Sequence, residues 1–156
     1  MSLPKRLRRW RERLILRMIN LYPPYLGAGI RVKRPAPDTF VVSMKLHWWN
    51  QNYVGTHFGG SLYSMCDPFF MLLLLQALGK EHVVWDKAAT IRFKKPGRGK
   101  VTARFHLPAG RIEEIREAAR EGKVEPVFTI EVTDERGEVV AEVEKVLYVR
   151  RKERES

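Results

Sequence analysis

Apolar residues recur at spacings of three and four along the first 21 residues, with six arginines between them. The apolar positions are Leu3, Leu7, Trp10, Leu14, Met18 and Leu21. This period is typical of an amphipathic helix. The sequence Tyr22-Pro23-Pro24 should end the helix, because proline lacks the amide hydrogen that helix continuation needs. We therefore expect residues 1–29 to form a basic amphipathic helix and a linker.

A second apolar segment runs from Ser61 to Leu78 and is apolar on nearly all sides after Pro68. Gly79 follows it and fits a helix C-terminus. A helix without a polar face must be enclosed by other structure. The pattern predicts one long, buried helix of about 18 residues, with a kink at Asp67 because Pro68 frees a backbone carbonyl.

The remaining patterned segments are strand-like, and they cover residues 39–46, 83–93, 100–107, 127–133 and 138–150. Turn residues fill 96–99 and 134–137, and residues 111–122 read as an exposed helix. A curved antiparallel sheet wrapped around the central helix satisfies this order. We expect an α+β fold with one domain over residues 30–150 and a frayed tail over 151–156. Open sheet edges favour a homodimer that continues the sheet.

Composition narrows the class of protein. The chain has 156 residues and a single cysteine, Cys66, which excludes a disulfide framework and a cysteine-based metal site. Its longest uninterrupted apolar stretch, residues 69–75, is extended by Gln76-Ala77-Leu78 and is still shorter than the roughly 20 residues that span a bilayer. We therefore expect a soluble, cytoplasmic protein with no metal.

The net charge of +11 is concentrated at one end of the chain. Residues 1–34 hold ten Lys and Arg and one acidic residue. Residues 35–156 hold nineteen Lys and Arg and seventeen acidic residues. This distribution argues against a nucleic-acid-binding face on the domain. For residues 1–21 we favour a helix packed on the domain or on a dimer partner. A weak contact with an anionic membrane surface, nucleic-acid binding and a cleavable presequence remain alternatives.

The residues with candidate chemistry surround the start of the central helix. Gly59 and Gly60 leave unpaired amides there, which could polarise a thioester carbonyl. Asp67 lies seven residues after Gly60, about 10 Å along a helix, which is too far to reach the same carbonyl within one subunit. In a two-fold dimer, Asp67 of one chain could reach the glycine amides of the other. Asp67 could then act as general base or nucleophile, although it could instead cap the second half of a broken helix.

The spacing Asn52-x2-Gly55-x2-Phe58-Gly59-Gly60, with Asp67 seven residues later, resembles the hotdog-fold thioesterases of the phenylacetyl-CoA thioesterase type. Residues 55–63 and 84–93 look like an uncharacterised branch of that superfamily. The resemblance covers residues 30–150. It implies a hotdog fold and acyl-CoA hydrolysis by a homodimer or a dimer of dimers, with no cofactor other than the CoA of the substrate.

Residue by residue, the resemblance makes Asp67 the catalytic acid and Gly60, with Gly59, the amide donor. Asn52 becomes the polar group that orients the carbonyl or the water. Phe58 stands where the thioesterases have histidine, and His57 beside it could supply an imidazole. The alternative is a non-catalytic protein that binds acyl-CoA or lipid.

Other residues are candidates for substrate contact. Phe58 and Tyr63 lie in the motif itself, and Lys94, Lys95 and Arg98 could contact the CoA phosphates. Asp86 could form an internal ion pair or act as a second catalytic acid.

Overall fold

One antiparallel sheet of six strands organises the molecule. The computed structural model describes residues 5–152, and in the first helix it describes the side chains of residues 10 and 13–20. The strand order is β1-β2-β4-β5-β6-β3. The strands are β1 Ile30–Ala36, β2 Thr39–Lys45, β3 His82–Phe93, β4 Lys100–His106, β5 Val127–Thr133 and β6 Val139–Arg151. Strands β1 and β3 are therefore the two edges of the sheet.

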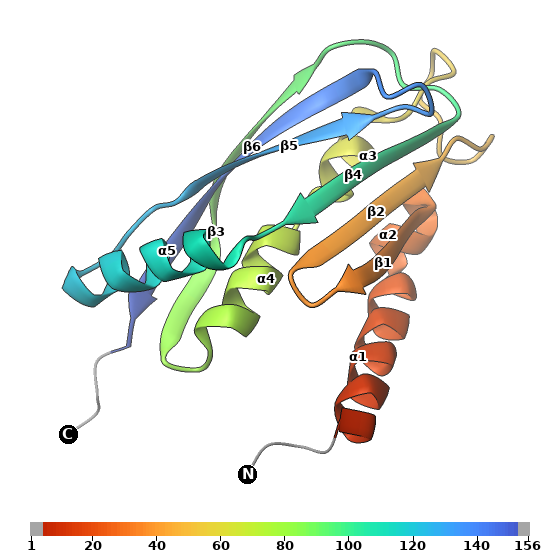
Figure 1. Cartoon of the computed structure of the whole chain (residues 1–156). Coiled ribbons are helices and arrows are strands. Elements are labelled where there is room, and N and C mark those ends of the chain that lie inside the picture. The colour runs from red at the N-terminus through yellow and green to blue at the C-terminus, as the bar shows by residue number, and fades with distance from the viewer. Residues whose placement is uncertain (1–4, 153–156) are drawn as a thin grey trace.

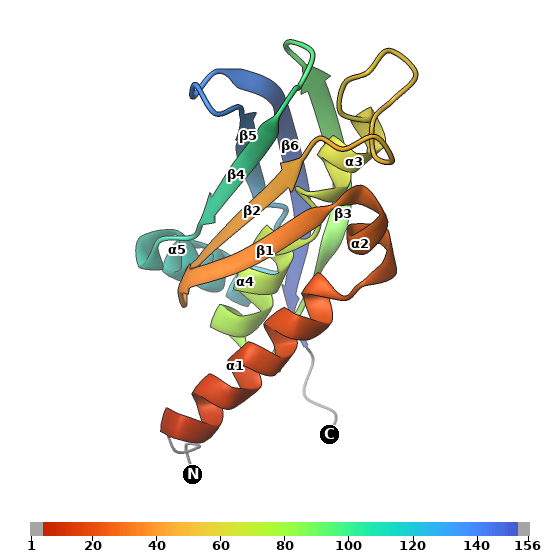
Figure 2. The same ribbon diagram turned by 90° about the vertical axis from the view of Figure 1, so that its right-hand side faces the viewer.

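The helices lie against this sheet. They are α1 Lys5–Asn20, α2 Pro23–Ala28, α3 Gly59–Ser64, α4 Phe69–Leu78 and α5 Ala109–Glu121. Figures 1 and 2 show the sheet curving around α4, with α1 beside β1 and α5 beyond the end of β4. The expected α+β fold, a curved antiparallel sheet around a central helix, is confirmed.

The prediction of one continuous helix over residues 61–78 is wrong. The helix is divided into α3 and α4 by Met65–Pro68, and the Asp67–Pro68 peptide bond is cis. The physical reason is Pro68, which cannot donate the backbone hydrogen bond of a helix interior. By length and composition alone, the stretch Gly59–Leu78 could cross a membrane, with 44% of it buried. Core helices of soluble proteins meet the same criterion, and here α4 fills the curve of the sheet.

The two ends of the chain also differ from expectation. The predicted linker contains α2, because the two prolines fit a first helical turn. The predicted tail begins inside β6, which continues to Arg151, and the Lys152 amide donates to the Glu81 carbonyl. Residues 1–4 and 153–156 of these segments lie outside the described residues.

Helix α1 is laid along the domain. Leu16 and Ile19 pack against the core, and the Asn20 side chain bonds both the amide and the carbonyl of Val32 in β1. Several apolar side chains of this segment remain exposed, namely Trp10, Leu14, Ile15, Met18 and Leu21. The helix therefore has an anchored side and an unburied apolar side.

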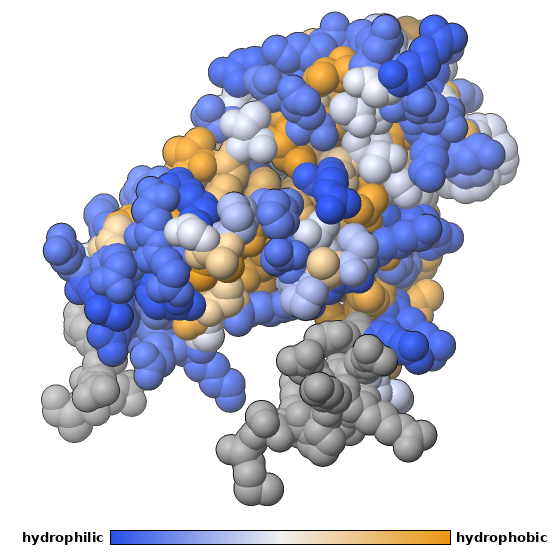
Figure 3. Space-filling model, in the orientation of Figure 1, coloured by the Kyte–Doolittle hydropathy of each residue, from blue (hydrophilic) through white to orange (hydrophobic). Residues whose placement is uncertain are grey.

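The core lies between α4 and the sheet. Phe69 is fully buried, and its ring centroid lies 5.3 Å from that of Phe40 and 5.0 Å from that of Phe105. Hydrophilic residues cover most of the face shown in Figure 3, with apolar residues gathered in its middle. In β6 the buried positions alternate as a half-exposed strand requires. One of those buried positions is not apolar but a lysine, Lys145.

Candidate active site

Lys145 is the centre of a charged cluster inside the sheet. Its side chain is 1% exposed, and Nζ donates hydrogen bonds to Asp67 Oδ1 at 2.6 Å and to the Tyr63 hydroxyl at 3.1 Å. Asp86 Oδ1, from β3, lies 2.9 Å from the same ammonium. Burying an ammonium is costly unless it is paired. These three partners make the burial possible, and we call Tyr63, Asp67, Asp86 and Lys145 the Asp67 cluster.

The electrostatics keep the lysine charged. Burial acts to lower the pKa of Lys145, but its hydrogen bonds to Asp67 and Tyr63 and its ion pair with Asp86 outweigh burial, so the pKa is raised. Burial raises the pKa of Asp86; the Lys145 ammonium opposes this rise and the neighbouring Asp67 carboxylate adds to it. The cluster thus joins one cation to two carboxylates of unequal exposure, 40% for Asp67 and 24% for Asp86.

The backbone of Asp67 is also fixed. The Tyr25 hydroxyl, from α2, donates to the Asp67 carbonyl, and the Tyr25 ring stacks on Phe69 with centroids 6.3 Å apart. The N-cap residue of α4 is Pro68, and no side chain caps this helix. The alternative that Asp67 caps α4 is therefore wrong. Its carboxylate turns to Lys145 instead, because a buried ammonium is the stronger partner.

Asp67 opens onto a cavity of about 600 Å³. Tyr63, Ser64 and Asp67 supply its polar groups. Its other walls are apolar or aromatic and come mostly from α1, α2 and the segment between them: Ile15, Met18, Ile19, Tyr22, Pro24, Tyr25, Pro68 and Leu72. A carboxylate beside an apolar enclosure suits a ligand with a reactive polar centre and an apolar chain.

A second cavity, of about 680 Å³, lies on the other side of α3. Asn52, His57, Gly59 and Leu62 line it, together with residues 93–98. No residue lines both cavities. Within one chain, Asp67 and Gly59 therefore face different spaces.

The two glycines make room for aromatic rings. A Cβ at Gly60 would lie 2.5 Å from Phe58 Cε1, and one at Gly59 would lie 2.9 Å from Phe93 Cζ. Both rings are more than half exposed. The amides of Ser61 and Leu62 donate to the Phe58 carbonyl, whereas within residues 5–152 the Gly59 and Gly60 amides have no acceptor. These two amides are free to bind an oxyanion, with the Phe58 ring beside them.

Asn52 and His57 hold the loop that precedes α3. Asn52 Oδ1 accepts hydrogen bonds from the backbone amides of Val54 and Thr56, and its Nδ2 donates one to Thr56 Oγ1 at 2.9 Å. His57 is 3% exposed and contacts the Gly99 carbonyl through Nε2 at 3.0 Å. Burial lowers the pKa of His57, and the bond to Gly99 partly opposes this. Asn52 therefore holds the loop from within, whereas His57 ties the loop to Gly99 in the connection between β3 and β4.

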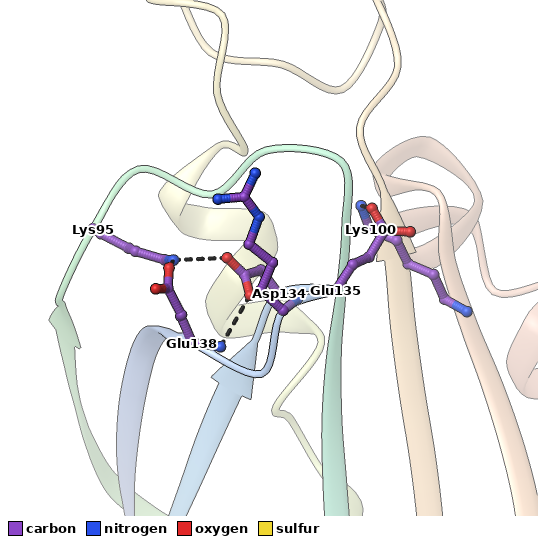
Figure 4. Close-up of polar contacts among 6 residues, drawn as sticks. Lys95, Lys100, Asp134, Glu135 and Glu138 are labelled. Carbon is purple, nitrogen blue, oxygen red and sulfur yellow. Dashed lines mark hydrogen bonds and ion pairs between the residues drawn. The ribbon is translucent and has the colours of Figure 1, made fainter.

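The three basic candidates differ in how far they are neutralised. Lys95 lies between Asp134, at 2.7 Å, and Glu138 (Figure 4), and these contacts raise its pKa. Lys94 Nζ is 4.0 Å from Glu142, and Arg98 donates to the Gly55 carbonyl. Lys94 and Arg98 thus keep more of their charge available to an anionic ligand than Lys95 does.

The described residues also bear on whether the protein could hold a metal ion. Within residues 5–152 no three His, Cys, Asp or Glu side chains are grouped so that they could hold a metal ion. The carboxylates of the cluster face a lysine instead.

The model of the DUF4442 family, described as a domain of unknown function, matches residues 11–149. The chain belongs to the DUF4442 family. Among curated proteins, none matches it.

Solved structures share the fold of this DUF4442 chain. PA5026 from Pseudomonas aeruginosa, a protein of unknown function named a probable thioesterase, is 26% identical, with 97% of this chain and 99% of that chain covered and a TM-score of 0.81. The thioesterase HI1161 from Haemophilus influenzae is 18% identical, with 89% and 91% covered and a TM-score of 0.65. The E. coli PaaI protein, from the phenylacetic acid degradation operon, is 20% identical, with 92% and 93% covered and a TM-score of 0.62. PA5026 is thus named a probable thioesterase and HI1161 a thioesterase, and the shared fold confirms the hotdog fold and the superfamily that the motif implies.

Sequence reasoning missed two residues of the DUF4442 site, Lys145 and Tyr25. A signal for Lys145 was present, since it interrupts the apolar phase of β6 between Val143 and Leu147. A lysine at an inward position of a strand needs buried acidic partners. Tyr25 had no comparable signal, because its contact with Asp67 spans 42 residues.

Proposed function

We propose that this DUF4442 protein hydrolyses acyl thioesters, specifically acyl-CoA, with Asp67 as the catalytic carboxylate. The observation that carries the proposal is the half-exposed Asp67 carboxylate, held by Lys145 at the edge of a mostly apolar cavity of about 600 Å³. The thioesterase neighbours support the same reaction class.

In the proposed reaction, water attacks the thioester carbonyl carbon while Asp67 accepts its proton. The carbonyl oxygen becomes an oxyanion, which amide donors stabilise. When the tetrahedral intermediate collapses, the carbon–sulfur bond breaks and the CoA thiolate takes the proton from Asp67. The products are a carboxylic acid and free CoA, and the carboxylate is restored.

The amide donors belong to a second subunit in this proposal, because Gly59 lines the second cavity and neither glycine lines the cavity onto which Asp67 opens. The partner subunit's Gly60 amide would face the carbonyl. Strand β3 supports a homodimer, since it is a sheet edge with Trp85 56% and Phe93 58% exposed. Pairing two such edges would satisfy their backbone groups and cover these rings. A dimer of dimers is a further possibility that molar mass in solution would reveal.

The CoA portion of the substrate is assigned to the second cavity. Arg98 and Lys94 stand at this cavity and could contact its phosphates, with Lys95 weakened by its two acidic neighbours. The proposal needs no other cofactor and no nucleic acid, and it places the reaction in the cytoplasm. A weak membrane-surface contact through residues 1–21 would use the exposed apolar side chains of α1.

One observation favours a second candidate, a non-catalytic acyl-CoA-binding protein. The Phe58 ring occupies the space beside Gly60, at the motif position where the related thioesterases have histidine. If that histidine is what turnover lacks, Phe58→His should raise hydrolysis.

The test is a thiol-release screen against short, medium, long and aromatic acyl-CoAs. Asp67→Asn is compared with the wild type and with Asp38→Asn, which changes a half-exposed aspartate in the β1–β2 turn. We expect Asp67→Asn to lower kcat by about 10²- to 10⁴-fold and Asp38→Asn to leave it unchanged. If no acyl-CoA is hydrolysed while one binds wild type and Asp67→Asn equally, the protein is a binding protein and the hydrolase proposal fails.

A further inference from the structure

Lys145 binds a neutral hydroxyl group, that of Tyr63, in addition to the carboxylates of its ion pairs. An ammonium has only donors, so the Tyr63 oxygen must be the acceptor of the 3.1 Å bond. The hydroxyl proton of Tyr63 is then directed away from Lys145. Tyr63 also lines the cavity onto which Asp67 opens. One buried cation therefore orients two polar groups at the edge of the same cavity.

Lys145 itself does not line that cavity. Its 1% exposure and its position within β6 leave it to act only through its partners. An ion pair with a purely structural role could be fully buried, whereas the Asp67 side chain is 40% exposed. The geometry is that of a group which supports others at a site.

Three further titratable groups among residues 5–152 interact with Asp67 or Lys145. The groups that face it are Asp86 from β3, Tyr25 from α2, and Cys66 beside Asp67. Burial raises the pKa of Cys66 to about 12 and also raises that of Tyr25, so both are neutral near pH 7. The ion pairs of Lys145 with Asp67 and Asp86 are then the charged contacts that the cluster itself contains.

We propose that Lys145 is the positioning residue of this site: it holds Asp67 as an oriented carboxylate and turns the Tyr63 hydroxyl proton toward the substrate. This inference rests on the proposed hydrolase function and deepens it. The Tyr63 proton would bond the thioester carbonyl or the attacking water, while Asp67 takes the proton of that water.

The test is the pH dependence of kcat for Lys145→Met. Lys145→Met removes the positive charge that favours the anionic form of the cluster, so the acid limb of the profile should move up in pH. KM should change little, because Lys145 does not touch the cavity. Lys123→Met removes an exposed lysine near Glu125 and is the matched control, with an unmoved limb. A structural role would lower the unfolding temperature but leave the limb of the folded enzyme in place.

Asp86→Asn keeps the proposal testable if Lys145→Met does not fold. This change removes the second negative charge that shares the Lys145 ammonium with Asp67. The acid limb should therefore move down in pH. An unmoved acid limb in Asp86→Asn, or in folded Lys145→Met, overturns the positioning role.

A second readout separates this inference from the proposed function. The chain has four aspartates, so ¹³Cγ-aspartate labelling gives four resonances, and Asp67→Asn identifies that of Asp67. The pH at which this signal titrates should shift in Lys145→Met and Asp86→Asn in the directions given above. If the wild type hydrolyses no thioester, the proposed function fails, yet this titration still decides whether Lys145 governs Asp67.

Discussion

The two sides of α3 are built in different ways. On one side, the Asp67 cluster joins residues separated by 78 and 82 positions in the sequence. On the other, Asn52 holds the loop of residues 52–60 through contacts that span two to five positions, and His57 and Gly55 add contacts with residues 97–99. The first side exists only when the sheet has closed around the helix, whereas part of the second is encoded locally.

This difference divides the proposed chemistry. The cluster supplies fixed charges, which need burial and long-range partners to be held in place. The loop supplies backbone amides, which need only a helix start and residues small enough to leave them open. Changes to the packed core should therefore affect the cluster far more than the loop.

The largest effect is expected from Phe69→Ala. Phe69 is fully buried and stacks with Tyr25, which bonds the Asp67 backbone. Loss of a core phenylalanine costs about 3–5 kcal/mol in the free energy of unfolding. Phe58→Ala, on the exposed loop side, should stay within about 0.5 kcal/mol. Urea denaturation of both variants measures the free energy of unfolding. Equal losses in the two variants would contradict the difference between the two sides of α3.

A smaller effect concerns His57 on the loop side. Because burial lowers its pKa in the folded state, the unfolded chain takes up the proton first as the pH falls below about 6.5. The contribution of neutral His57 is thus complete above that pH and is lost on acidification, at no more than about 1.4 kcal/mol per pH unit. The free energy of unfolding should decline more steeply from pH 7 to 5 in the wild type than in His57→Gln. Parallel declines would mean that His57 is not held neutral by the fold.

The smallest effect is expected from Gly60→Ala. The added Cβ meets Phe58 Cε1, but that ring is exposed and can turn away. Alanine also favours a helix over glycine by up to about 1 kcal/mol. The unfolding temperature should therefore change little, and the displaced Phe58 ring should be visible in aromatic NMR shifts. A loss of several kcal/mol would show that the loop is as tightly packed as the cluster.

Much of the fold could be predicted because local patterns carry it. The alternation in β6 and the turn at residues 134–137 follow from the sequence. The sequence predicts a kink in the central helix at Asp67, whereas the structure divides this helix into α3 and α4. Strand β1 was missed, since Pro35 and Pro37 suggest a turn, yet an edge strand tolerates proline.

The site was less accessible to prediction than the fold. Asp67, Tyr63 and the two glycines stand in one contiguous motif and were named from it. Lys145 lies far away in sequence, and only its inward position on β6 indicated a buried charge.

The hydroxyl of Tyr25 has a consequence for how this protein can be divided. A chain shortened to residues 30–150 would keep every motif residue, including Asp67. It would lose the Tyr25 bond to the Asp67 carbonyl and the walls of the cavity contributed by α1 and α2. The N-terminal helices are thus not a detachable appendage. A chain that exchanges these helices for a foreign segment should need compensating changes around Asp67.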